Sequence, residues 1–307
     1  MRSPLELRRG GEPAPPDYIG VGALGSGTGW WHAMLLAHPE IGPPRGRRRA
    51  LHHFDRFCAS EMTEADVAEY HARFPRRAGT IRGEWTGRYM FDGWTPPLLR
   101  RAAPDARLLV MISDPVERYR AILADRLAKR EAGEPVFMTD VVERRSFASQ
   151  LARLRRYFDP ERILVLQFER CRREPLVQYR RTLDFLEVRD RDFAPRRLRR
   201  KAAGKPEALH VEVLLRLGLP EGTKRRIVER ITGRPAGRQT AELWPDLEAA
   251  LHTALDLQVE ALADTVPGFD VSLWPNFAHL GDQPAAAGAE RPSTAPESSS
   301  ASTTTAS

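Results

Sequence analysis

The stretch Tyr18–Trp31, YIGVGALGSGTGWW, decides the fold. Its first six residues are an apolar run that predicts a buried strand, and Leu24–Gly29 form a glycine-rich turn. A helix is predicted over Trp30–Ala37. This order suits an anion cradle, because glycines let backbone N–H groups approach a ligand and a helix N-terminus adds partial positive charge. Thr28 can donate its hydroxyl to a phosphate oxygen.

The same loop is also compatible with an ordinary strand-to-helix turn that happens to be rich in glycine. It differs from the loop of ATP- and GTP-hydrolysing enzymes, because no Gly-Lys-Ser/Thr follows it. The first lysine of the chain is Lys129, which argues further against that class of enzyme.

Apolar runs and helical periods alternate along the rest of the chain. Strands are predicted over Arg107–Ile112 and Ile163–Phe168. Helices are predicted over Val116–Arg130, Ser146–Phe158, Pro175–Leu186 and Leu247–Ala263. Apolar strands separated by helices predict an α/β fold with three αβα layers, in which helices cover both faces of a parallel sheet.

The 307 residues suffice for one large domain, which we expect over residues 17–281. Residues 1–16 predict a flexible N-terminus, and the low-complexity residues 282–307 predict a disordered tail. Neither a membrane span nor a signal peptide is evident, so a cytoplasmic location is expected. Cys58 and Cys171 match no metal-ligand spacing, so we expect reduced thiols and no metal.

The net charge of +7 comes almost entirely from arginine. Arginine binds phosphate and sulfate through a planar fork, which favours an anionic ligand. The same composition also arises from a GC-rich genome without any functional meaning. No helix-turn-helix or RNA-binding motif accompanies the charge, so no specific nucleic-acid partner is expected. Nothing in the sequence predicts the oligomeric state.

Several motifs in colinear order resemble the sulfotransferases that use 3′-phosphoadenosine-5′-phosphosulfate (PAPS), in particular bacterial and glycosaminoglycan-type members. The first, GVGALGSGTGWW, resembles the family's G-V-G-A-Q-K-(A/S)-G-T-T/S-W-L. The others are LHHFDRF at Leu51–Phe57, GEWTGRYM at Gly83–Met90, PDARLLVMISDPVERYRAIL at Pro104–Leu123 and RILVLQFERCRREP at Arg162–Pro175.

The resemblance implies a P-loop NTPase-like sulfotransferase fold. It also implies that the chain transfers a sulfuryl group from PAPS to a hydroxyl or amine of a small-molecule or carbohydrate acceptor. The implied donor-binding residues are Gly25, Ser26, Gly27, Thr28, Gly29, Trp30, Ser113, Arg118 and Arg120.

Four positions depart from the family pattern. Gly25 replaces the loop lysine that meets the sulfate, and Ala50 replaces the glutamate base. Ser113 and Ala121 replace the arginine and serine that hold the 3′-phosphate. A fixed donor at the developing charge is worth about 3–4 kcal/mol, and a positioned base contributes about 10²–10⁴ in rate. These departures leave a catalytically weak or inactive protein that binds a nucleotide or partner as an alternative.

Other residues could replace what is missing. His52, His53 and Glu84 are candidates for the base, although histidines here can equally be packed, hydrogen-bonded residues. Arg118 and Arg120 could supply charge to the 3′-phosphate. Two basic runs, at residues 45–49 and 197–205, could reach the donor or could be solvated loops. Trp31 is expected in the core.

Overall fold

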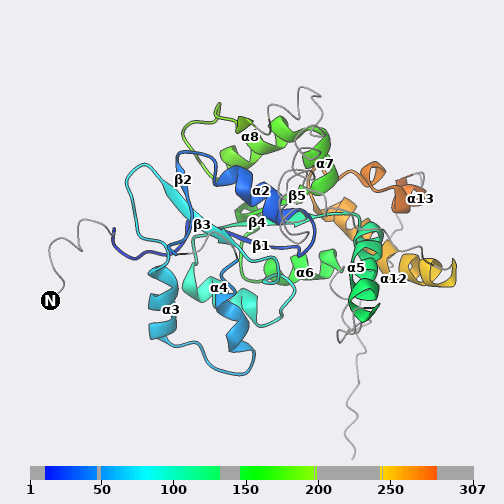
Figure 1. Cartoon of the computed structure of the whole chain (residues 1–307), viewed down its shortest axis with the longest axis horizontal. Coiled ribbons are helices and arrows are strands. Elements are labelled where there is room, and N and C mark those ends of the chain that lie inside the picture. The colour runs from blue at the N-terminus through cyan, green and yellow to red at the C-terminus, as the bar shows by residue number, and fades with distance from the viewer. Residues whose placement is uncertain are drawn as a thin grey trace, which may run out of the picture.

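The computed structural model describes residues 11–46, 50–131, 146–196, 198, 243 and 245–281. Parallel strands form a sheet in the order β2-β3-β1-β4-β5, with β1 at its centre (Figure 1). Their bounds are Tyr18–Gly22 for β1, Ile41–Gly42 for β2, Ile81–Trp85 for β3, Arg107–Ile112 for β4 and Ile163–Gln167 for β5. All of these strands end at one edge of the sheet, which is where ligands bind in open α/β sheets.

The side chains of β4 show that both faces of the sheet are buried. Leu108, Val110 and Ile112 belong to one hydrophobic core, and Leu109 and Met111 belong to a second. Successive side chains of a strand point to opposite faces, so the two cores lie on opposite sides of the sheet. The uninterrupted apolar run of this strand is typical of that situation.

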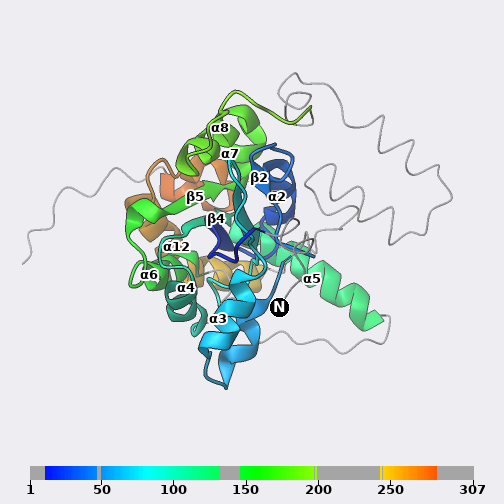
Figure 2. The ribbon, with the colours of Figure 1, turned by 90° about the vertical axis from the view of Figure 1, so that its left-hand side faces the viewer.

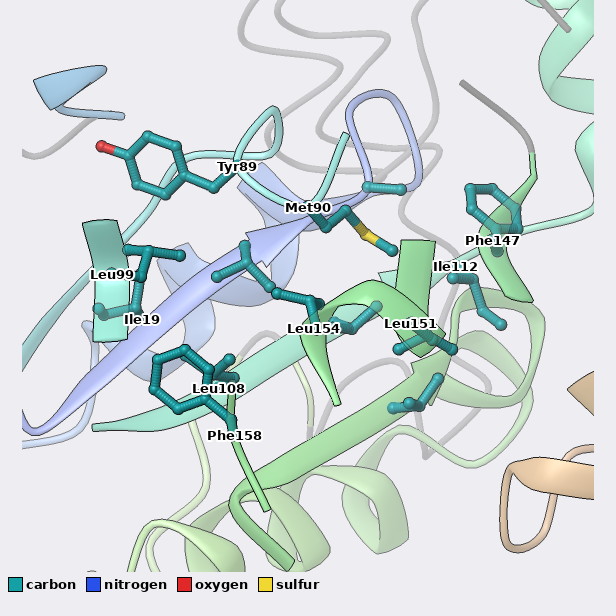
Figure 3. Packing of buried hydrophobic residues seen from close by; sticks show 14 of the residues in the cluster. Ile19, Tyr89, Met90, Leu99, Leu108, Ile112, Phe147, Leu151, Leu154 and Phe158 are labelled. Carbon is teal, nitrogen blue, oxygen red and sulfur yellow. The ribbon is translucent and has the colours of Figure 1, made fainter. Parts of the chain in front are cut away.

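Helices cover each face. One face carries α2 (Thr28–Leu35), α7 (Phe168–Arg173) and α8 (Pro175–Phe185). The other carries α4 (Thr95–Ala102), α6 (Phe147–Leu154) and α12 (Pro245–Thr265). Figure 3 shows part of the core that contains Leu108, where Leu151 and Leu154 of α6 lie in one cluster with Leu108 and Ile112 of β4. The predicted three-layer αβα architecture is therefore confirmed.

The remaining elements join or flank these layers. They are α3 (Glu64–His71), α5 (Pro115–Glu131), α13 (Ala278–Gly281) and the 3-10 turns η1 (His53–Cys58), η3 (Pro160–Arg162), η4 (Val271–Leu273) and η5 (Pro275–Phe277). Figure 2 shows α5 projecting away from the sheet. No helix in the described ranges combines the length and apolarity that crossing a bilayer requires.

Most predicted elements are present, with shifted ends. β4 has its predicted bounds, and β1 and β5 each end one residue early. α2 begins at Thr28 instead of Trp30, because Gly27 adopts the left-handed conformation and caps the helix there. α6 covers only part of the predicted helix over residues 146–158. The predictions for residues 1–10 and 282–307 lie outside the described residues.

Candidate anion-binding site

Two glycines shape the turn between β1 and α2. Gly25 has φ +85° and Gly27 has φ +81°, in the left-handed region that disfavours side chains. A Cβ on Gly27 would also lie 2.3 Å from Cε2 of Phe168. Phe168 begins α7 directly after β5, so a neighbouring strand end closes one side of the turn. Backbone conformation therefore favours glycine at both positions, and the contact with Phe168 leaves no room for a side chain at Gly27.

Some backbone N–H groups at the start of α2 already have acceptors within the chain. Ser26 N–H donates to the carbonyl of Ala23 at 3.1 Å, and Trp30 N–H donates to the carbonyl of Gly27 at 3.0 Å. The first N–H groups of a helix have no acceptor within it. The groups that can face a ligand are thus those of residues 27–29, and a Cβ at Gly29 would meet no atom within 4 Å.

Two buried serines connect the loop to the end of β4. The Ser113 hydroxyl donates to Oγ of Ser26 at 3.0 Å. The next residue, Asp114, caps α5, because its Oδ1 accepts from the N–H groups of Val116 at 2.9 Å and Glu117 at 3.1 Å. The β4–α5 junction therefore holds Ser113 against the loop.

Arg118 lies directly against the glycine loop. Its side chain is 5% exposed, and its guanidinium stacks over the ring of Phe147 at 5.6 Å. A Cβ built on Gly25 would lie 3.3 Å from Nε of Arg118. An arginine from α5 thus lies beside the position that corresponds to the loop lysine of relatives.

Arg120 points elsewhere, although the sequence offers it on equal terms with Arg118. It donates to Glu117 at 2.7 Å and to Glu248 at 2.6 Å. It also donates to Asn276 at 3.2 Å. Two carboxylates already compensate its charge, so the contacts tie Arg120 to α12 and the C-terminal segment.

Glu84 is completely buried rather than open to an acceptor. Its Oε1 accepts from the hydroxyls of Tyr70 and Tyr89, each at 3.1 Å. Its Oε2 accepts from the hydroxyl of Thr86 at 2.6 Å and from the N–H of Leu51 at 3.2 Å. Burial raises the pKa of this carboxyl above its usual range. Four hydrogen-bond donors contact the Glu84 carboxylate, so we interpret its role as structural.

This buried network holds the backbone of residues 51–53. The N–H of His52 donates to Oγ1 of Thr86 at 3.3 Å. The N–H of His53 donates to the hydroxyl of Tyr89 at 3.0 Å. Glu84 and its partners therefore position the two histidine candidates instead of taking a proton from an acceptor directly.

The two histidines differ in environment. The His52 side chain is 47% exposed, and its Nδ1 lies 2.9 Å from Asp55 Oδ2. His53 is half-buried, with its ring 4.9 Å from that of Tyr70. Burial, aided by Arg56, lowers the pKa of His53, which favours its neutral form. Its Nε2 is buried and has no hydrogen-bond partner among the described residues.

A cavity opens beside these histidines. Its volume is about 310 Å³, and it is lined by Leu51, His52, His53, Arg56, Glu69 and Arg73. Arg56 donates to Glu69 at 2.8 Å across the lining. The cavity is therefore polar and carries charges of both signs.

The two tryptophans after the loop are both buried. Trp31 is fully buried, and its Nε1 donates to Oγ1 of Thr182 at 3.3 Å, in agreement with the expected core position. Trp30 is 6% exposed and packs edge-on to Phe168 at 6.2 Å. Trp30 thus supports the wall of the turn. Phe168, which sequence reasoning missed, could have been found from its place at the end of the strand predicted over Ile163–Phe168.

Most residues of the two basic runs lie outside the described part of the chain. Arg47, Arg48 and Arg49 lie outside the described residues, as does nearly all of the basic run at 197–205. Arg45 is exposed, and its N–H donates to the carbonyl of Arg73 at 2.7 Å.

Comparison with known proteins identifies the fold. No family model matches the sequence. The fold is that of a sulfotransferase, because a crystal structure of a sulfotransferase from Alicyclobacillus acidocaldarius superposes with a TM-score of 0.57. That match covers 85% of this chain and 99% of that chain at 20% identity. The resemblance predicted from the sequence is confirmed: the chain has the sulfotransferase fold.

Two further proteins are similar to this chain. Human heparan sulfate glucosamine 3-O-sulfotransferase 6 is 27% identical over 186 residues, which cover 56% of this chain. The chain spans about half the length of that curated relative, 52% of it. Mouse sulfotransferase SULT7A1 complexed with PAP matches at 11% identity and a TM-score of 0.47, over 85% of this chain and 88% of that chain. A TM-score of 0.47 is too low to bear on the site.

Proposed function

We propose that the chain binds PAPS and transfers its sulfuryl group to a hydroxyl or amine of a small-molecule or carbohydrate acceptor. The observation that carries this proposal is the glycine turn with Arg118 packed beside Gly25. In the proposed complex, the N–H groups of residues 27–29 bind the 5′-phosphosulfate. The Thr28 hydroxyl adds a donor, and Arg118 replaces the missing lysine. No metal takes part in the proposed transfer, and a cytoplasmic location stays a prediction.

Arg118 suits the role because of its chemistry and its fixed position. Sulfuryl transfer spreads negative charge over the sulfuryl and leaving oxygens, as phosphoryl transfer does. A preorganised cation lowers the energy of that charge without reorganising during the reaction. Arg118 is buried and stacked on Phe147, so its side chain is already held in place before a donor arrives.

His53 is the group we propose as general base. Its lowered pKa favours the neutral imidazole, which can accept a proton, and His53 lines the cavity. As the acceptor oxygen or nitrogen bonds to sulfur, its proton passes to His53. The bond from sulfur to the bridging oxygen breaks, and adenosine 3′,5′-bisphosphate (PAP) leaves with that oxygen. Ala50, at the usual base position, has only a methyl group and cannot serve.

A second candidate function is nucleotide or partner binding without catalysis. Ala50 favours it, because no carboxylate stands at that position. The two candidates share the donor site and differ in the acceptor step. A transfer assay therefore distinguishes the two candidate functions, whereas a measurement of donor binding does not.

The test measures PAP binding by calorimetry and transfer from radiolabelled PAPS across a panel of hydroxyl and amine acceptors. Gly27→Ala should abolish binding, because the new Cβ would meet Phe168. Gly79→Ala is the matched control. Gly79 has φ +72°, and a Cβ added there would have no atom within 4 Å, so this substitution introduces backbone strain without a steric clash. PAP binding without transfer to any acceptor would favour the second candidate, and no PAP binding at millimolar ligand would refute both.

A variant of His53 tests the proposed base separately. His53→Gln should reduce transfer by about 10²–10⁴-fold, the usual contribution of a positioned base. PAP affinity should stay within a factor of about two, since the loop is untouched. Equal losses of binding and transfer would instead indicate that His53 only supports the fold.

A further inference from the structure

Three potential metal ligands converge where α12 meets the C-terminal segment. They are His252 and Asp256 of α12 and His279 of α13. Each offers one ligand atom, and these atoms all lie within 4.8 Å of one another. Imidazole nitrogen and carboxylate oxygen are ligands that Zn²⁺ takes in proteins.

The fold brings these residues together by two separate means. His252 and Asp256 are four residues apart, so they lie on the same face of a helix. His279 comes from the chain after η5, where Phe277 is fully buried in the core. The ring of His252 contacts both Phe277 and His279 edge-on, each at 5.4 Å. The position of His279 is thus fixed by core packing and not by the ligands alone.

An ion pair accounts for only part of the cluster. His279 Nε2 lies 3.1 Å from Oδ2 of Asp256, which is hydrogen-bond distance. The other oxygen, Oδ1, lies 3.7 Å from Nδ1 of His252 and forms no hydrogen bond with it. Both of these atoms are buried and have no hydrogen-bond partner among the described residues. Burying a polar atom without a partner costs free energy, so two atoms here lack a compensating ligand.

We propose that His252, Asp256 and His279 bind a divalent transition metal ion of the Zn²⁺ class, with water completing the coordination. Ligands about 2.0–2.1 Å from a tetrahedral Zn²⁺ lie roughly 3.4 Å apart. The separations of 3.1 Å from His279 to Oδ2 of Asp256 and 3.7 Å from His252 to Oδ1 lie on either side of that value. One ligand atom from each residue can be chosen so that all three lie within 4.8 Å of one another, so a bound ion needs a small inward shift of the side chains. The cysteine spacing led us to expect no metal, but this site uses no cysteine and the third ligand is distant in sequence.

The ion links the C-terminal segment to the rest of the domain. That segment also reaches the β4–α5 junction, because Nδ2 of Asn276 donates to Oδ2 of Asp114 at 2.8 Å. Nε1 of Trp274 donates to Oε2 of Glu169 at 2.8 Å. A metal bound at His279 would hold this segment at its far end. Its role is therefore structural, which is the common use of a site away from the reacting groups.

The experiment uses the full chain without a polyhistidine tag, after treatment with a chelator that is then removed. Zn²⁺ binding is measured by calorimetry and by the shift in melting temperature. We expect binding near one equivalent and a rise in melting temperature. Asp256→Asn, His252→Gln and His279→Gln should each weaken Zn²⁺ affinity at least about tenfold, since even outer-shell changes reach that size. Mg²⁺, which prefers oxygen ligands, should produce no shift.

Asp264→Asn is the matched control, because it removes the same charge from an exposed position of α12. Cys58→Ser excludes binding at the exposed thiol. Both should bind Zn²⁺ like the parent protein. The visible spectrum of the Co²⁺ form should change in the three ligand variants only. Zn²⁺ binding that is absent, or that survives all three substitutions, would overturn the proposal and leave His279 and Asp256 as an ion pair.

Discussion

Removing the guanidinium of Arg118 should weaken donor binding far more than removing the charge of Arg120 or Arg180. Arg118→Gln shortens the side chain and removes the charge beside Gly25. A hydrogen bond to a charged group contributes about 1.5–3 kcal/mol. Since about 1.4 kcal/mol is tenfold in affinity, PAP should bind roughly tenfold to 150-fold more weakly.

The same substitution also affects the fold, and the assay must separate the two effects. The guanidinium stacks on Phe147 at 5.6 Å, a contact worth about 0.5–2 kcal/mol. Affinity is therefore measured by calorimetry well below the melting temperature of each variant. Arg118→Lys keeps the charge but loses the planar fork, so its affinity should lie between those of the parent and of Arg118→Gln.

Two further variants decide whether the reasoning holds. Arg180→Gln, on α8 with its side chain 62% exposed, removes one charge at a remote surface and should bind PAP like the parent. Arg120→Gln should change affinity little, because Glu117 and Glu248 already compensate that charge. A large loss for Arg120→Gln together with near-parental binding by Arg118→Gln would refute the assignment of the donor cation.

Three other changes test separate parts of the structure. Gly25→Lys should lower transfer and melting temperature, because φ is +85° there and the side chain would crowd Arg118. Burial raises the pKa of Glu169 from 4.5 to about 7, so the folded state binds more protons and stability should fall as pH rises through that window. The free energy of unfolding should fall by up to about 3 kcal/mol. The fall should be smaller in Glu169→Gln, as measured by urea unfolding at several pH values. Truncation after residue 281 should change stability by less than about 0.5 kcal/mol, as measured by thermal unfolding.

The elements that could be predicted from the sequence are the strands whose side chains are buried on both faces of the sheet. Arg107–Ile112 is apolar after its first residue, because both of its faces lie in a core, and its bounds were found without error. The turn after β1 was found because its glycines are required by conformation. By contrast, β3 was missed, since IRGEW contains an arginine, a glycine and a glutamate and has no continuous apolar run like those of β1, β4 and β5.

Arg118 and Arg120 show why the candidate site could be predicted only in part. They lie two residues apart on one helix and carry the same charge, so local sequence cannot rank them. The residues that bind Arg120 include Glu248 and Asn276, which are 128 and 156 positions away. Only the packing of α12 and the C-terminal segment on α5 shows that Arg120 is engaged and that Arg118 faces the loop.

Glu84 shows how a buried charge can serve a site without taking part in its chemistry. A carboxylate in the core is costly unless donors surround it. Here the donors come from α3, from the turn after β3 and from the backbone of Leu51. Each carboxylate oxygen accepts from two donors, and removing any one of them leaves that oxygen with a single partner, so the network favours a single arrangement of residues 51–53. The position of His53 beside the cavity therefore depends on Glu84, which does not contact the acceptor. We expect a Glu84 variant to be inactive because His53 is displaced. An inactive variant in which His53 keeps its position would contradict this positioning role.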